Sequence, residues 1–105
     1  MLLMKKQFFD AIRTGRKTTT LRYWRRALVA AGSVHNIRGL GRIRIDRVRP
    51  VALRELRVAD AHADGFETLA ALKRALKEMY PARNSSDGRR LYQIHFTFLL
   101  EPGND

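Results

Sequence analysis

The segment RIRIDRVRPVAL, residues 42–53, is the clearest strand in the sequence, and it decides the fold that we expect. Ile43 and Ile45 alternate with arginines, which is the pattern of a half-buried strand. The valines that follow do not keep this phase, so we expect a β-bulge or a corner, as in the bent strands of small barrels. Pro50 indicates an edge or exit position for the end of the strand, because proline has no N–H for the ladder.

The segments on either side of this strand predict a small α+β fold. Hydrophobic spacing and turn residues predict the following further elements, in chain order: a helix over 5–15, strands over 18–21 and 33–37, helical spacing from 53 to 66, a helix over 68–81 and a strand over 91–100. Residues 23–31 are ambiguous, since they could form a helix with Trp24, Leu28 and Ala31 inward. The architecture that best fits this order is a small mixed β-barrel with peripheral helices.

Length and composition fit one domain over residues 1–105, with residues 101–105 as a frayed tail. The chain has no cysteine, which suits a reducing cytoplasm. No segment approaches the roughly 20 apolar residues that span a bilayer. The short apolar run at the start precedes the lysines, which is the reverse of a secretory signal. We therefore expect a cytoplasmic protein with no membrane partner.

The net charge of +11 lies entirely in the first half of the chain. Residues 1–50 hold thirteen lysines and arginines against two aspartates, whereas residues 51–105 hold eight bases and eight acids. Arginine grips phosphate with a planar fork, so we expect a polyanionic partner, most simply RNA or DNA, with solubility alone as the alternative. The side chains that we expect to contact nucleic acid are Arg16, Arg22, Trp24, Arg25, Arg26, Arg42, Arg89 and Arg90.

The segment TGRKTTTLRYWRR, residues 14–26, holds the candidate chemistry. If its threonine run is extended, Thr20 and Arg22 lie on the face away from Leu21, near Lys17. A threonine hydroxyl becomes a nucleophile only when a base takes its proton, and a lysine can serve when burial or neighbouring cations lower its pKa. No carboxylate flanks the threonines, so an acid for the leaving group has to come from elsewhere in the fold.

Binding of nucleic acid by the same segment requires fewer groups than catalysis does. Its cations provide phosphate contacts, and the rings of Tyr23 and Trp24 provide surfaces on which a base can stack. Ordinary core packing is the alternative for Trp24. The three histidines lie far apart and no pair has metal-ligand spacing, so we expect neither a metal nor another cofactor.

Four blocks of the sequence, within residues 7–98, together resemble the ASCH domain (activating-signal-cointegrator homology). The signature Gly-x-Lys-x-x-Thr-x-Arg matches from Gly15 to Arg22, and an acid-Gly-Phe step before a helix matches at Asp64. The segments IRIDRVRPVALREL and LYQIHF supply the other two blocks. The resemblance implies a PUA-like β-barrel with peripheral helices and a cleft for RNA or a modified nucleoside.

The resemblance also implies a metal-independent amidohydrolase that cuts the acetyl amide of N4-acetylcytidine. Thr20 would attack the acetyl carbonyl, and Lys17 would accept its proton or stabilise the oxyanion. Asp64 would pass a proton to the leaving cytosine amine. A non-catalytic RNA-binding module and an ASCH-type ribonuclease are the alternatives.

This sequence departs from the family's pattern at the site. The family's acid is typically glutamate, and Asp64 is one methylene shorter, which shortens its reach. Tyr23 and Trp24 stand where the family often has an acid, and Ser33 stands where it often has an aspartate. The aromatic side chains and the extra arginines favour a longer RNA ligand over a lone nucleoside.

Overall fold

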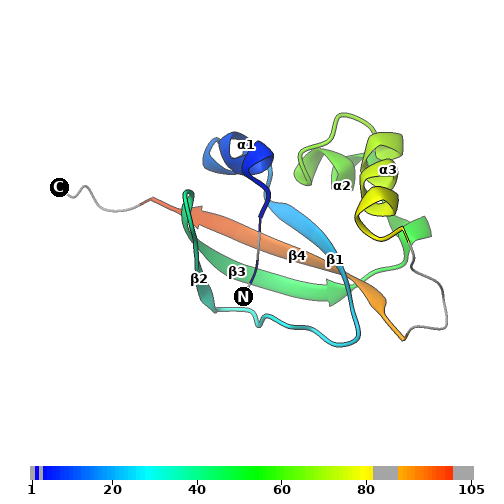
Figure 1. The fold of residues 1–105 in the computed structure, drawn as a ribbon, viewed down its shortest axis with the longest axis horizontal. Coiled ribbons are helices and arrows are strands. Elements are labelled where there is room, and N and C mark those ends of the chain that lie inside the picture. Colours follow the sequence, from blue (N-terminus) through cyan, green and yellow to red (C-terminus); the bar gives the residue numbers. More distant parts are fainter. Residues whose placement is uncertain (1, 3, 82–87, 101–105) are drawn as a thin grey trace.

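The computed structural model describes Leu2, residues 4–81 and residues 88–100. Its elements, with the short 3-10 helices written η, are η1 (Lys6–Phe8), α1 (Phe9–Arg13), β1 (Thr19–Trp24), β2 (Val34–Ile37), β3 (Gly41–Pro50), η2 (Leu53–Glu55), α2 (Val58–Ala63), α3 (Leu69–Met79) and β4 (Arg90–Leu99). Figure 1 shows a curved sheet with α2 and α3 standing together and α1 apart from them. The expected α+β class, with helices around a curved sheet, is confirmed.

The four strands form one antiparallel sheet in the order β1-β4-β3-β2. The expected bulge is present, because the register between β3 and β4 shifts between Ile45 and Arg47. The extra residue lets Ile45 and Val48 contact the same core although they lie three positions apart. The strand β1 lies at the edge of the sheet, and it carries the threonines of the candidate site.

Each face of the sheet has its own core. The buried side chains of the first core are Leu2, Phe9, Ile12, Val29, Ile37, Leu40, Ile43, Ile45, Tyr92, Ile94 and Phe96. Those of the second core, which α2 and α3 cover, are Leu21, Leu56, Ala61, Leu72, Leu76 and Leu91. Thr20 pairs with Ile94 in the register of β1 and β4, so its side chain lies on the face opposite Leu21. Thr20 is also buried, so the first half of β1 is buried on both faces, whereas its second half is only partly buried.

The predicted helix over residues 68–81 is confirmed as α3. The helix begins after Thr68, whose Oγ1 accepts a hydrogen bond from the N–H of Ala71 at 3.0 Å. Leu72 and Leu76, which lie one helical turn apart, are buried in the second core. Met79, at the end of α3, is 40% exposed and lines a pocket instead.

The helix considered for residues 23–31 is wrong. The strand β1 continues through Trp24, whose ring lies 5.9 Å from the ring of Tyr92, and the chain after it is not helical. Leu28 and Ala31, expected to point inward, are exposed. Pairing with β4 satisfies the backbone of β1, so tertiary contacts override the local spacing.

The helical spacing expected from 53 to 66 divides into η2 and α2. Leu56 is buried between them, whereas Leu53 is 41% exposed. The frayed tail expected at residues 101–105 lies outside the described residues.

Candidate functional site

Two segments far apart in sequence meet at Lys17 and Asp64. Lys17 follows α1, and its N–H donates to the carbonyl of Ala11 at 2.9 Å. Asp64 ends α2 and pairs with Lys17 in an isolated antiparallel bridge. Gly65 follows with φ +92°, a left-handed conformation that favours glycine, and a Cβ at this position would lie 3.5 Å from the Lys17 Cβ. The acid-Gly step of the sequence thus carries the chain closely past the lysine.

Lys17 and Asp64 form a buried ion pair. The Lys17 Nζ lies 3.3 Å from Asp64 Oδ2 and donates to the Asp64 carbonyl oxygen at 2.7 Å. The Thr19 hydroxyl donates to Asp64 Oδ1 at 3.0 Å, and the Phe8 ring lies 4.7 Å from Nζ. Only 3% of Lys17 and 5% of Asp64 are exposed to solvent. Both charged groups are therefore held in fixed positions and are largely removed from water.

Burial shifts both groups toward their neutral forms. It lowers the pKa of the Lys17 amine, and it does so against the attraction of the Asp64 carboxylate. The nearby cation of Arg22 also lowers the Lys17 pKa. Burial raises the pKa of Asp64 despite the charge of Lys17 and the hydrogen bond from Thr19. A lysine that can release its proton therefore stands next to a carboxyl that can hold one.

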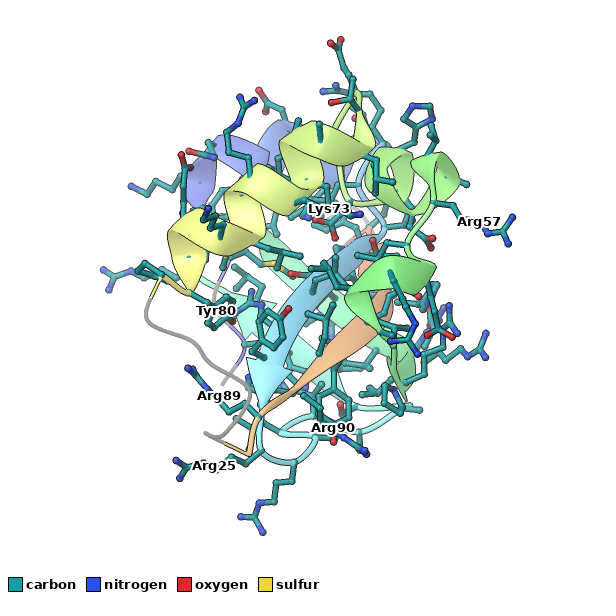
Figure 2. All side chains as sticks on the ribbon, turned by 90° about the vertical axis from the view of Figure 1, so that its right-hand side faces the viewer. Arg25, Arg57, Lys73, Tyr80, Arg89 and Arg90 are labelled. Carbon is teal, nitrogen blue, oxygen red and sulfur yellow. The ribbon has the colours of Figure 1, made fainter. Side chains whose placement is uncertain are left out.

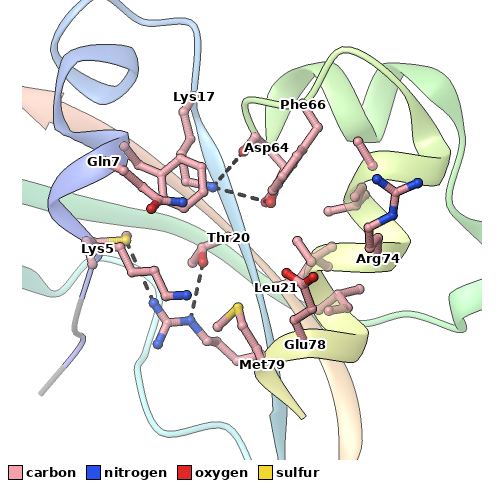
Figure 3. A pocket seen from close by; sticks show the side chains of 17 residues that line it. Lys5, Gln7, Lys17, Thr20, Leu21, Asp64, Phe66, Arg74, Glu78 and Met79 are labelled. Atoms are coloured by element: carbon pink, nitrogen blue, oxygen red, sulfur yellow. Dashed lines mark hydrogen bonds and ion pairs between the residues drawn. The ribbon is translucent and has the colours of Figure 1, made fainter. Parts of the chain in front are cut away.

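The ion pair opens onto a pocket of about 280 Å³ between the N-terminal segment, β1 and α3. Thr20 is buried in its wall, where its Oγ1 accepts a hydrogen bond from Arg22 Nε at 3.3 Å. Figure 3 shows Lys17, Asp64 and Thr20 on one side of this pocket and Glu78 and Met79 along α3 on the other. The volume lies near the lower end of the range for small-molecule sites, about 300–1,000 Å³.

The structure brings together the three residues that the sequence suggested for chemistry, since Lys17, Thr20 and Asp64 all line this pocket. In the described part of the chain no hydrogen bond joins Lys17 Nζ to the Thr20 hydroxyl. Thr18 is exposed and lies outside the pocket, and Thr19 is 1% exposed with its hydroxyl on Asp64. The threonine run therefore places three hydroxyls in three different environments.

Sequence reasoning missed the apolar and charged walls of the pocket. Phe8 and Phe66 make an edge-to-face contact with ring centroids 5.8 Å apart, and both line the pocket. Glu78 and Met79 line it from the last turn of α3. The local signal for Met79 was its helical spacing of three positions from Leu76, and no local signal indicated Glu78.

The residues expected to contact nucleic acid fall into separate places. Trp24, Arg25, Arg26 and Arg89 line a shallow hollow together with Tyr23 and Leu28. Figure 2 shows Arg25, Arg89 and Arg90 at one end of the molecule, and the Arg89 guanidinium lies 5.7 Å from the centroid of the Tyr80 ring.

The other four residues expected to contact nucleic acid lie outside this hollow, and one of them, Arg90, is exposed at the start of β4. Arg22 lines the pocket of Lys17. Arg16 is exposed in the turn after α1, where it donates to the Thr14 hydroxyl, and Arg42 lies on β3. Trp24 is half-buried against Tyr92, so core packing uses much of its ring.

Across the described residues, no group of three or more histidine, aspartate or glutamate side chains could hold a metal ion. No helix within those ranges is both long enough and apolar enough to cross a membrane.

No protein-family model matches this chain, and neither does any curated protein. Its fold is similar to that of the ASCH domain from Lactobacillus crispatus JV V101, with a TM-score of 0.70 and 16% identity over 85% of this chain and 68% of that one. It is also similar to the hypothetical protein PH0355, with a TM-score of 0.74 and 12% identity over 92% and 95% of the two chains. Protein EF3133 from Enterococcus faecalis V583, described with the family DUF984, has a TM-score of 0.65 and 20% identity over 87% and 69%.

Proposed function

We propose that this chain, which has the fold of an ASCH domain, binds a modified nucleoside in the Lys17 pocket and hydrolyses the acetyl amide of N4-acetylcytidine. One observation carries the proposal: a buried lysine–aspartate pair opens onto the same pocket as the Thr20 hydroxyl. A base, an acid and a potential nucleophile then face one space of the size that a small ligand fills.

The surroundings of each group support its role. The lowered pKa of Lys17 favours a free amine that can accept the proton of Thr20. The raised pKa of Asp64 favours a carboxyl that can donate a proton. The Arg22 Nε lies 3.3 Å from the Thr20 oxygen, so its positive charge would stabilise negative charge that develops there. The rings of Phe8 and Phe66 give a cytosine base an apolar wall.

The proposed reaction has two steps. In the first, Thr20 Oγ1 bonds to the acetyl carbon and gives its proton to the Lys17 Nζ. The bond from that carbon to the cytosine N4 then breaks, N4 takes a proton from Asp64, and cytidine leaves an acetyl ester on Thr20. In the second, water gives a proton to Asp64 and its oxygen bonds to the ester carbon. The bond from that carbon to Thr20 Oγ1 then breaks, Lys17 returns its proton to Oγ1, and acetic acid leaves and ionises to acetate. No redox change and no further reactant are needed.

The test is incubation of the chain with N4-acetylcytidine, followed by chromatography for cytidine. We expect cytidine release by the wild type, and its loss in Thr20→Val, which removes the hydroxyl and keeps the branched shape. Thr18→Val is the matched control, because Thr18 is exposed and lies outside the pocket. Absence of cytidine release by the wild type, or equal loss in both variants, would overturn the proposal.

A second candidate is RNA binding without chemistry, and the hollow beside β1 favours it. Tyr23 and Tyr80 meet edge to face at 5.1 Å, and Arg25 and Arg26 lie next to Tyr23 in the lining. Rings and guanidinium groups in one hollow suit a stacked base and its phosphates. Here Arg25→Ala should weaken binding of a short RNA and leave any turnover of the nucleoside unchanged. The same RNA resolved on a gel after incubation tests the ribonuclease alternative, for which shortened products are required.

A further inference from the structure

Four arginines form a row on one face of β3. Arg42, Arg44, Arg47 and Arg49 lie on the side of the strand away from Ile43 and Ile45, which face the first core. We call these four residues the arginine row. Three of its members are exposed and Arg49 is half-buried. At about 3.3 Å per residue, the row extends over about 23 Å.

The bulge in β3 creates this row. Side chains in a strand alternate between the faces, so Arg42 and Arg44 would normally lie opposite Arg47 and Arg49. The register shift between Ile45 and Arg47 absorbs one residue, Asp46. Both arginine pairs therefore emerge on the same face. Without the shift, half of the row would point into the isoleucine core.

The acids near the row are already occupied. Asp46 accepts hydrogen bonds from Arg44 Nε at 2.8 Å and from the Thr97 hydroxyl at 2.6 Å. These two bonds lower the pKa of Asp46, so it stays ionised and neutralises Arg44. Asp60 accepts from Gln93 Nε2 at 3.0 Å. The charge of Arg49 acts on Asp60 and helps to lower its pKa against the effect of burial, but in the described part of the chain neither carboxylate forms an ion pair with Arg47 or Arg49.

The middle of the row keeps its positive charge available. In the described part of the chain Arg47 has no ion pair, and Arg49 uses its Nε on Gln93 Oε1 at 3.1 Å. Burial lowers the pKa of His95, which lies opposite Arg47, and the charges of Arg47 and Arg49 lower it further. The charges of Asp60 and Asp46 act in the opposite direction and raise the His95 pKa, but they have the smaller effect, so positive charge outweighs negative charge around this imidazole.

The neighbours of the row are of the kind that contact a nucleic acid backbone. Thr97, His95 and Gln93 lie opposite Arg44, Arg47 and Arg49. Hydroxyl, amide and guanidinium groups are the usual partners of phosphate oxygens and of the ribose 2′-hydroxyl. A protein partner would need apolar or aromatic anchors at the centre of the patch, and none of these three residues supplies one.

We infer that the arginine row is a second binding surface, which holds the phosphate backbone of an RNA strand on the face of β3. The surface is separate from the Lys17 pocket, since none of the row's residues lines that pocket. Phosphates bound by the exposed arginines of the row would hold a longer RNA at a distance from the pocket. The inference does not depend on any reaction in the pocket.

The test compares Arg42→Gln/Arg47→Gln with Lys73→Gln/Lys77→Gln, a control that removes the same charge from exposed positions of α3. Fluorescence anisotropy measures binding of a labelled 12-nucleotide RNA over a series of salt concentrations. On single strands each phosphate contact contributes about 0.7 to the slope of the logarithm of the binding constant against the logarithm of salt concentration. The first variant loses two contacts, so we expect its slope to become shallower by about 1.4, and we expect the slope of the control to stay unchanged. Circular dichroism checks that both variants are folded.

The outcomes separate this inference from the proposed function. An unchanged slope in the arginine variant, or an equal change in the control, would overturn the arginine row as a binding surface. A DNA strand of the same sequence that binds as tightly as RNA, or a polyglutamate peptide that displaces the RNA at equal concentration, would overturn RNA as its occupant. Turnover of N4-acetylcytidine nucleoside is measured in parallel, and it should be the same in both variants, because neither changes the pocket.

Discussion

Replacing Lys17 by methionine tests whether the ion pair is also structural. Methionine keeps the length and removes the charge, so Asp64 is left buried with the Thr19 hydroxyl as its remaining side-chain partner. Removing one member of a buried pair costs about 3–5 kcal/mol. Asp64 can relieve part of this cost by taking up a proton, because burial already raises its pKa. We therefore expect a loss near the lower limit, about 3 kcal/mol in the free energy of unfolding.

Urea unfolding followed by circular dichroism measures this loss, and a companion change completes a double-mutant cycle. At about 4–8 °C per kcal/mol for a chain of this size, the midpoint of thermal unfolding should fall by about 12–24 °C. Asp64→Leu should also destabilise, whereas Lys17→Met/Asp64→Leu should be more stable than the sum of the two losses predicts, since no buried charge remains. Additive losses, or a loss below about 0.5 kcal/mol in Lys17→Met, would refute the reasoning. If Lys17→Met loses this much stability, a loss of activity in that variant could come from unfolding, so Thr20→Val is the better test of chemistry.

Three further predictions concern local conformation and pH. Gly65→Ala should lower the free energy of unfolding by about 1–2 kcal/mol, because φ is +92° and the added Cβ meets only ordinary contacts; urea midpoints measure this. Thr68→Ala should cost about 1 kcal/mol by removing the acceptor for the Ala71 N–H, and Thr68→Ser should restore most of it in the same assay. If Lys17 acts as base and Asp64 as acid, kcat/KM should follow a bell-shaped pH profile. The active pair holds one proton, so activity falls when the pair gains a second proton in acid and when it loses its last proton in alkali. Burial raises the pKa of Asp64 and lowers that of Lys17, so the acidic limb should lie above pH 3.8 and the alkaline limb below pH 10.5. A profile that is flat between these values contradicts the assignment.

The elements that the sequence predicted correctly are those whose side chains repeat along one segment. Ile43 and Ile45 alternate on β3, and Leu72 and Leu76 follow the helical period on α3. The break in the alternation was enough to predict the bulge, because a strand with one buried face must keep its apolar residues on that face. The prediction failed at Trp24, where a helical spacing existed but pairing with β4 determined the conformation.

The sequence by itself determined the elements with a regular period, such as β3 and α3, the acid-Gly step at Gly65 and the concentration of positive charge in the first half of the chain, since each is a property of neighbouring residues. The tertiary structure alone decided that Lys17 meets a carboxylate 47 positions away and that both groups are buried. It also decided that the arginines on either side of Asp46 share one face. The reason is that periodicity follows from local backbone geometry, whereas desolvation and charge pairing depend on which distant segments pack together.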